Sequence, residues 1–94
     1  MLYQVKEWQS PSGYWKCNCV DDLGKNSALW YHPARILKIS PADFIRLLLK
    51  DFKPDCFYFD EKNCLCFWSW KSQESMRKYK NWINKKAREA NYQI

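Results

Sequence analysis

The stretch between residues 56 and 70 constrains the fold most, because two short segments rich in aromatic residues flank a polar turn within it. Cys56–Phe59 and Cys64–Trp70 carry residue types that favour strands, and residues 60–63, Asp-Glu-Lys-Asn, have the composition of a turn. The pattern therefore predicts a β-hairpin.

Both faces of this predicted hairpin are apolar. Alternation along the chain assigns its side chains to two sets. One set holds Phe57, Phe59, Leu65 and Phe67, and the other holds Cys56, Tyr58, Cys64, Cys66, Trp68 and Trp70. A strand pair with one face in water would alternate apolar and polar residues. Either the hairpin is covered on both sides, or one of its faces is a binding surface.

A further hairpin is predicted at the start of the chain. Leu2–Gln9 and Tyr14–Val20 are rich in β-formers, and the Ser-Pro-Ser-Gly turn between them has Pro and Gly at favoured turn positions. A short third strand is expected at either Ala28–Tyr31 or Arg35–Ile39, because Pro33 breaks any continuity between the two segments. We favour the second segment.

Two helices are predicted, and each follows a serine that can cap it. Ser40 precedes Pro41 at the first helical position, and this helix should run to about Phe52, with a broad apolar face that packs in the core. Pro54 prevents its extension. Ser72 begins a last helix that extends to about residue 91.

The last helix is predicted to be amphipathic. Its apolar stripe consists of Met76, Tyr79, Ile83, Ala87 and Ala90. Its opposite side carries the basic residues Arg77, Lys78, Lys85 and Arg88. Trp82 lies at the edge of the stripe, where a ring can be partly buried and partly available to a partner.

The fold class that follows is α+β, in the order β-β-(β)-α-β-β-α, with an antiparallel or mixed sheet packed by two helices. The 94 residues are expected to form one small domain, residues 1–94, because this length supports a single core.

Positive charge is concentrated near the end of the sequence. The net charge is +6, yet residues 1–70 carry nine Lys or Arg against eight Asp or Glu, whereas residues 71–94 carry seven against two. Such asymmetry indicates a polyanionic partner.

The sequence begins without a secretory leader and contains no apolar run long enough to cross a bilayer, so we expect a cytoplasmic location with reduced thiols. The five cysteines include two Cys-x-Cys pairs, Cys17/Cys19 and Cys64/Cys66, which with His32 raise the question of a metal. Alternating strand positions hold such sulfurs too far apart, so we expect buried thiols and no metal or cofactor. Whether the two pairs meet in space stays open at this level.

Catalysis is not expected. The only histidine, His32, precedes a proline and has no nucleophile signature around it, and the two glycines cannot form a phosphate-binding loop.

We therefore predict a small basic, aromatic-rich binding module that contacts nucleic acid, preferably single-stranded, through phosphate contacts from the last helix and stacking on exposed rings. The residues predicted to do so are Lys71, Arg77, Lys78, Lys85, Arg88, Tyr58, Trp68, Trp70 and Trp82. The alternative is a protein interaction module, such as a small inhibitor or adaptor, that docks a Trp/Tyr patch on an acidic protein surface. The choice depends on whether Tyr58, Trp68 and Trp70 share an exposed face.

Overall fold

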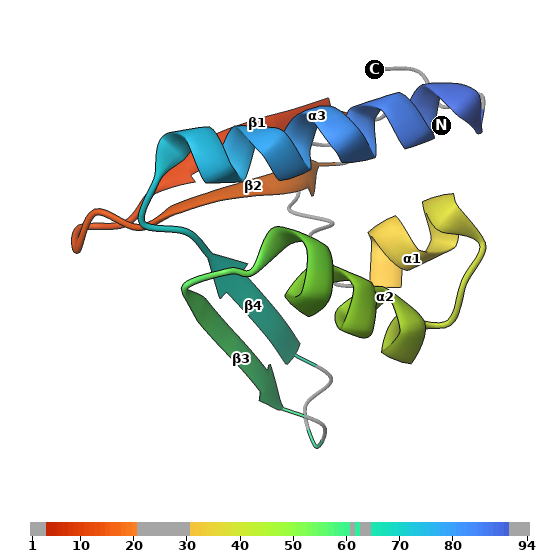
Figure 1. Ribbon diagram of the computed structural model, residues 1–94, viewed down its shortest axis with the longest axis horizontal. Helices are drawn as coiled ribbons and strands as arrows, with labels where there is room; N and C mark the ends of the chain where they lie inside the picture. The colour runs from red at the N-terminus through yellow and green to blue at the C-terminus, as the bar shows by residue number, and fades with distance from the viewer. Residues whose placement is uncertain (1–3, 21–30, 61, 63–64, 91–94) are drawn as a thin grey trace.

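The computed structural model describes residues 4–20, 31–60, 62 and 65–90. Figure 1 shows β-hairpins packed with helices, the α+β class that the sequence predicts. The elements are β1 (Gln4–Gln9), β2 (Trp15–Val20), α1 (Tyr31–Leu37), α2 (Pro41–Leu47), η1 (Leu48–Phe52), β3 (Cys56–Asp60), β4 (Leu65–Ser69) and α3 (Gln73–Glu89).

The first hairpin forms where predicted, and its turn is closed by hydrogen bonds within the turn itself. The Gly13 amide donates to the Ser10 carbonyl at 2.8 Å, and the Tyr14 amide donates to Ser10 Oγ at 3.0 Å. Gly13 has a φ of 91°, a conformation that a residue without a Cβ adopts at little cost. Strands β1 and β2 then pair antiparallel.

The predicted third strand at Arg35–Ile39 is wrong, because α1 occupies most of that segment. Pro33 is the third residue of α1, in the first turn, where its missing N–H has no helical acceptor to lose. Ala34 and Ile36 are buried, and packing of this short helix outweighs the weak strand preference of the segment. Of the alternative strand at residues 28–31, only Tyr31 is described, and it begins α1.

The helix predicted after Ser40 is confirmed, including its cap. The Asp43 amide donates to Ser40 Oγ at 3.1 Å. The helix continues through η1, a turn of π-helix, and ends at Lys53, which has a left-handed φ of 44°. Phe44 and Leu48 are fully buried, which agrees with the core face that the sequence predicts.

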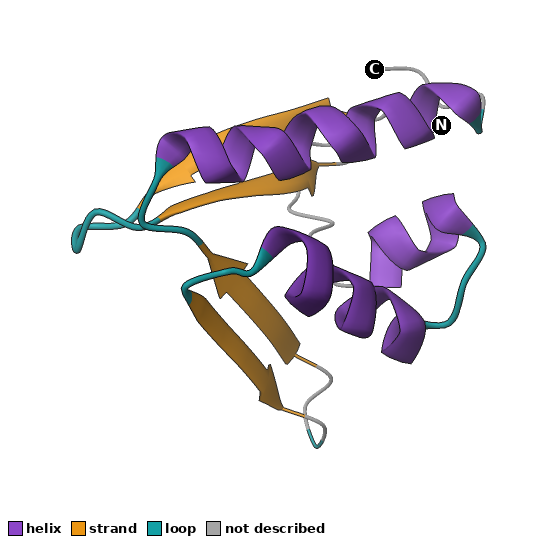
Figure 2. Cartoon of the chain, in the orientation of Figure 1, coloured by secondary structure: helices purple, strands orange, loops and turns teal. Residues whose placement is uncertain are grey.

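The second hairpin is confirmed as well, but β3 and β4 form a sheet separate from β1 and β2. One isolated bridge connects the two hairpins, in which the Trp70 amide donates to the Trp15 carbonyl at 2.7 Å. Figure 2 shows the two strand pairs diverging from this region. The structure thus has two small sheets in place of one.

Helix α3 lies along the β1–β2 hairpin (Figure 1) and begins at the predicted cap, where the Ser75 amide donates to Ser72 Oγ at 3.2 Å. The predicted apolar stripe is buried at Met76, Tyr79, Ile83 and Ala87. Tyr79 is central to the core, because its ring contacts Phe52, Trp68, Trp70 and Trp82. No helix in the described part of the chain combines the length and apolar character needed to cross a bilayer.

Candidate functional site

The register of the second hairpin overturns the predicted division of its side chains. Tyr58 pairs with Phe67, and Phe57 pairs with Trp68. Four residues separate the two strands, so an even-numbered residue of β3 lies opposite an odd-numbered residue of β4. Residues directly opposite share a face of the sheet. Tyr58 therefore shares its face with Phe67, and not with Trp68 and Trp70 as alternation along the chain predicted.

The tryptophans predicted to stack on bases belong largely to the core. Trp70 is 1% exposed, and its indole Nε1 donates to the Phe52 carbonyl at 2.7 Å. Trp68 is half-buried, with its ring centroid 5.7 Å from that of Phe44. Trp82 is also half-buried, 5.0 Å from the ring of Phe52. No platform of Tyr58, Trp68 and Trp70 exists.

A different pair of rings is exposed on this hairpin. Tyr58 is 56% exposed and Phe67 is 51% exposed, and their rings are stacked, with centroids 6.4 Å apart and planes 26° apart. The Lys16 ammonium lies over the Phe67 ring, 5.8 Å from its centroid. This distance is within the range of a cation–π interaction, which holds the charge of Lys16 next to the exposed ring of Tyr58.

The exposed surface continues onto the first hairpin. Lys16 lies directly opposite Trp8, which is 46% exposed. Their neighbours Glu7 and Cys17 point the other way, toward α3 and the core, so Trp8 and Lys16 lie on the face of the hairpin away from α3. We call the four residues Trp8, Lys16, Phe67 and Tyr58 the ring strip.

A groove of about 390 Å³ lies along Lys16, Phe67 and Tyr58 of the ring strip, where the two hairpins meet. Its lining residues are Ser10, Ser12, Tyr14, Lys16, Cys56, Phe57, Tyr58, Phe67, Trp68 and Ser69. Aromatic rings and hydroxyl groups dominate this set, and among the described residues that line the groove Lys16 is the one basic side chain and none is a carboxylate. Such a groove suits a flat ligand with a negative charge at one end.

The basic residues of α3 lie elsewhere. Lys78, Lys85 and Arg88 are exposed, Lys78 and Lys85 lie on the side of α3 opposite the buried stripe, and none of the three is among the described residues that line the groove. Lys71, just before α3, is exposed too, and its backbone amide donates to Asp55 Oδ2 at 2.8 Å. The predicted rings and the predicted cationic ridge are thus separate surfaces.

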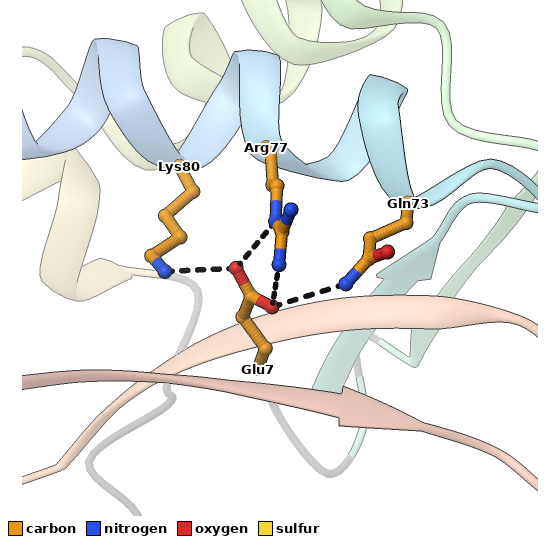
Figure 3. Close-up of polar contacts among 4 residues, drawn as sticks. All are labelled: Glu7, Gln73, Arg77 and Lys80. Carbon is orange, nitrogen blue, oxygen red and sulfur yellow. Dashed lines mark hydrogen bonds and ion pairs between the residues drawn. The ribbon is translucent and has the colours of Figure 1, made fainter.

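Arg77 is exposed but not free on the ridge, because it binds Glu7 on β1 (Figure 3). The carboxylate accepts hydrogen bonds from Arg77 Nε at 3.1 Å, from Lys80 Nζ at 2.8 Å and from the side-chain Nε2 of Gln73 at 3.5 Å. Hydrogen bonds from Arg77 and Lys80 lower the pKa of Glu7 to about 2. These four residues, the Glu7 cluster, fasten β1 to α3.

The described thiols differ in burial: Cys17 and Cys66 are buried, and Cys56 is exposed. Burial raises the pKa of Cys17 to about 12 and that of Cys66 to about 11. Cys56 is exposed and lines the groove. Within the described ranges no three His, Cys, Asp or Glu side chains are arranged to hold a metal ion. The side chains of Cys19, Cys64 and His32, on which the open question of a meeting of the two Cys-x-Cys pairs depends, lie outside the described residues.

Of the four residues of the ring strip, the sequence pointed to Tyr58 and not to Trp8, Lys16 or Phe67. The sequence could have indicated the position of Phe67. When the loop of a hairpin has an even number of residues, the strand ends determine which residues of the two strands share a face. Lys16 carried no such signal, because its position depends on how one hairpin meets the other.

Comparisons with known proteins find no matching family model, and no curated protein or solved structure is significantly similar to this chain.

Proposed function

We propose that this protein binds single-stranded nucleic acid in the groove, with a base stacked on Tyr58 and the adjoining phosphate held by Lys16. The observation that carries the proposal is the Lys16 ammonium above the Phe67 ring, beside the exposed ring of Tyr58. Rings flanked by a cation are what proteins use to bind unpaired bases and their backbone.

The two rings have different tasks in this proposal. Lys16 lies over Phe67, so Phe67 serves to position the ammonium. Tyr58, the more exposed of the two, offers its face to a base. Base stacking on an aromatic side chain contributes roughly 1–3 kcal/mol. Double-stranded segments keep their bases stacked on one another, so the proposal favours single strands.

Charge orients the ligand along the hairpin. Lys16 lies at one end of the Tyr58–Phe67 pair. Asp60, two residues beyond Tyr58 on β3, marks the other end of this face. A phosphate is attracted to the first end and repelled from the second, which places the backbone of the bound strand near the first hairpin.

The exposed cations of α3 support the proposal differently. Lys78 and Lys85 lie away from the groove, so they attract a polyanion at long range without holding it in the site. Replacing both by Gln should slow association and leave dissociation nearly unchanged. Arg77 is unsuitable for such a test, because its replacement by Gln would also remove an ion-pair partner of Glu7.

The test is fluorescence anisotropy with a labelled single strand of about eight nucleotides. Tyr58→Ala should weaken binding about 5- to 150-fold through lost stacking. Between 50 and 200 mM salt the affinity should fall about 3- to 7-fold, the change expected when one or two phosphates of a single strand are neutralised. Lys16→Gln should flatten that dependence.

Phe59→Ala is the matched control. Phe59 is an exposed ring on the same hairpin, but it lies on the other face, opposite Cys66. Its removal should change affinity less than about 2-fold, well under the loss of one stacked base. If Tyr58→Ala binds as tightly as the wild type, or if no oligonucleotide binds at low salt, the proposal is wrong and the ring strip is better explained as a protein-docking surface.

A further inference from the structure

We infer that the groove selects ribonucleotides over deoxyribonucleotides, so that its ligand is single-stranded RNA; this inference rests on the proposed function. The groove has hydroxyl groups on both hairpins, from Ser10, Ser12 and Tyr14 on one side and from Ser69 on the other. A hydroxyl both donates and accepts hydrogen bonds, as does the ribose 2′-OH, which is the group that distinguishes RNA from DNA.

The covalent structure of a nucleotide determines which part meets these hydroxyls. With the base on Tyr58 and the phosphate at Lys16, the sugar must lie between them. Ser69 is suited to meet it, because it lies on the same face as Phe67 and opposite Cys56 in the hairpin register. Tyr14 and Ser10 approach from the first hairpin, at the turn end of the strand that carries Lys16.

Ser12 keeps hydrogen-bonding capacity for a ligand. Its Oγ lies 3.0 Å from Ser10 Oγ, and Ser10 Oγ already accepts the Tyr14 amide. If Ser10 donates to Ser12, the Ser12 hydroxyl hydrogen remains available; if Ser12 donates, its oxygen can still accept. Ser12 is exposed at the rim, so a ribose hydroxyl can reach it without a change in the turn.

Deoxyribose offers only a methylene at the same point. It would displace water from these hydroxyls without replacing the lost hydrogen bond. One net hydrogen bond is worth about 0.5–1.5 kcal/mol, which corresponds to a preference for RNA of about 2- to 12-fold.

The experiment compares labelled oligo-uridine with oligo-deoxyuridine of the same length, because the two differ only in the 2′-OH. We expect RNA to bind about 2- to 12-fold more tightly. Equal binding, or tighter binding of the DNA, would overturn this inference and leave the proposed function standing. Failure of both probes to bind would overturn the proposed function itself.

Variants then locate the selectivity. Ser12→Ala combined with Ser69→Ala should weaken RNA binding and leave DNA binding unchanged, so that their ratio approaches one. Ser10 is left intact because its side chain closes the turn. Ser75→Ala is the control, since it removes a hydroxyl from the first turn of α3, which is not part of the groove. If the double variant still prefers RNA to DNA as strongly as the wild type, the Ser12 and Ser69 hydroxyls are not the source of the selectivity.

Discussion

Glu7→Gln tests whether the Glu7 cluster stabilises the contact between β1 and α3. The substitution preserves the size of the side chain and removes the negative charge that Arg77 and Lys80 surround. The Glu7 side chain is only 19% exposed, so its charge is partly shielded from water in the folded protein. Loss of this charge should lower the free energy of unfolding.

The pKa of Glu7 gives the magnitude. It falls from an ordinary value of 4.5 to about 2 on folding, and each pKa unit corresponds to about 1.4 kcal/mol. The ionised carboxylate thus contributes at most about 3 kcal/mol. Arg77 is exposed and solvent screens its charge, so we expect Glu7→Gln to cost about 1–2 kcal/mol at neutral pH.

The sign of the pH dependence follows from the depressed pKa. The stabilisation by ionised Glu7 is complete above pH 4.5. It is lost as the pH falls from 4.5 through about 2, because the carboxylate is protonated first in the unfolded protein and then in the folded protein. Urea unfolding followed by tryptophan fluorescence, at neutral pH and at steps toward pH 2, measures the wild type against the variant. Urea is uncharged and leaves the ion pairs unscreened.

Glu89→Gln is the matched control, because Glu89 forms an exposed pair with Lys86 at 3.6 Å in the same helix. Such a pair contributes less than about 0.5 kcal/mol. If Glu7→Gln costs no more than Glu89→Gln at neutral pH, or if its cost stays constant down to the lowest pH, the electrostatic account of this contact is refuted.

Three further substitutions or labelling experiments probe other parts of the structure. Trp70→Phe should destabilise the protein by about 2–3 kcal/mol, because it shrinks a buried side chain and leaves the partly buried Phe52 carbonyl without its donor; thermal or urea unfolding measures this, and a neutral result would contradict the buried position of Trp70. Asn84→Ala should stabilise the protein by about 1 kcal/mol, since Asn84 Oδ1 is buried without a hydrogen-bond partner and Ala is the better helix former; a loss of stability would show that the amide is satisfied in solution. Iodoacetamide followed by peptide mass mapping should label Cys56 at the rate of a free thiol and Cys17 and Cys66 at least about 10-fold more slowly, because burial raises the pKa of the last two; comparable rates for all three would contradict their burial.

Local signals predicted the elements that depend on local chemistry. The caps at Ser40 and Ser72 and the turn from Ser10 to Gly13 are each made by hydrogen bonds over three or four residues, and all three form as predicted. The buried stripe of α3 follows from helical periodicity alone. These features do not depend on the rest of the fold.

The errors concern features that depend on distant contacts. Residues 31–37 have no strong local preference for helix or strand, so packing against the rest of the fold determines that they form a helix. The burial of Trp70 depends on Tyr79 and Phe52, which belong to other elements. Arg77 has a basic side chain on the polar side of α3, and only the approach of β1 gives it Glu7 as a partner.

The bridge between Trp15 and Trp70 gives the groove a mechanical property. The two walls belong to separate sheets that this bridge connects within the described part of the chain, so the walls meet at the bridge. A ligand that touches both walls would hold them together on either side of it. The Trp15 and Trp70 amides would then exchange with solvent more slowly when the groove is filled, although neither amide touches the ligand.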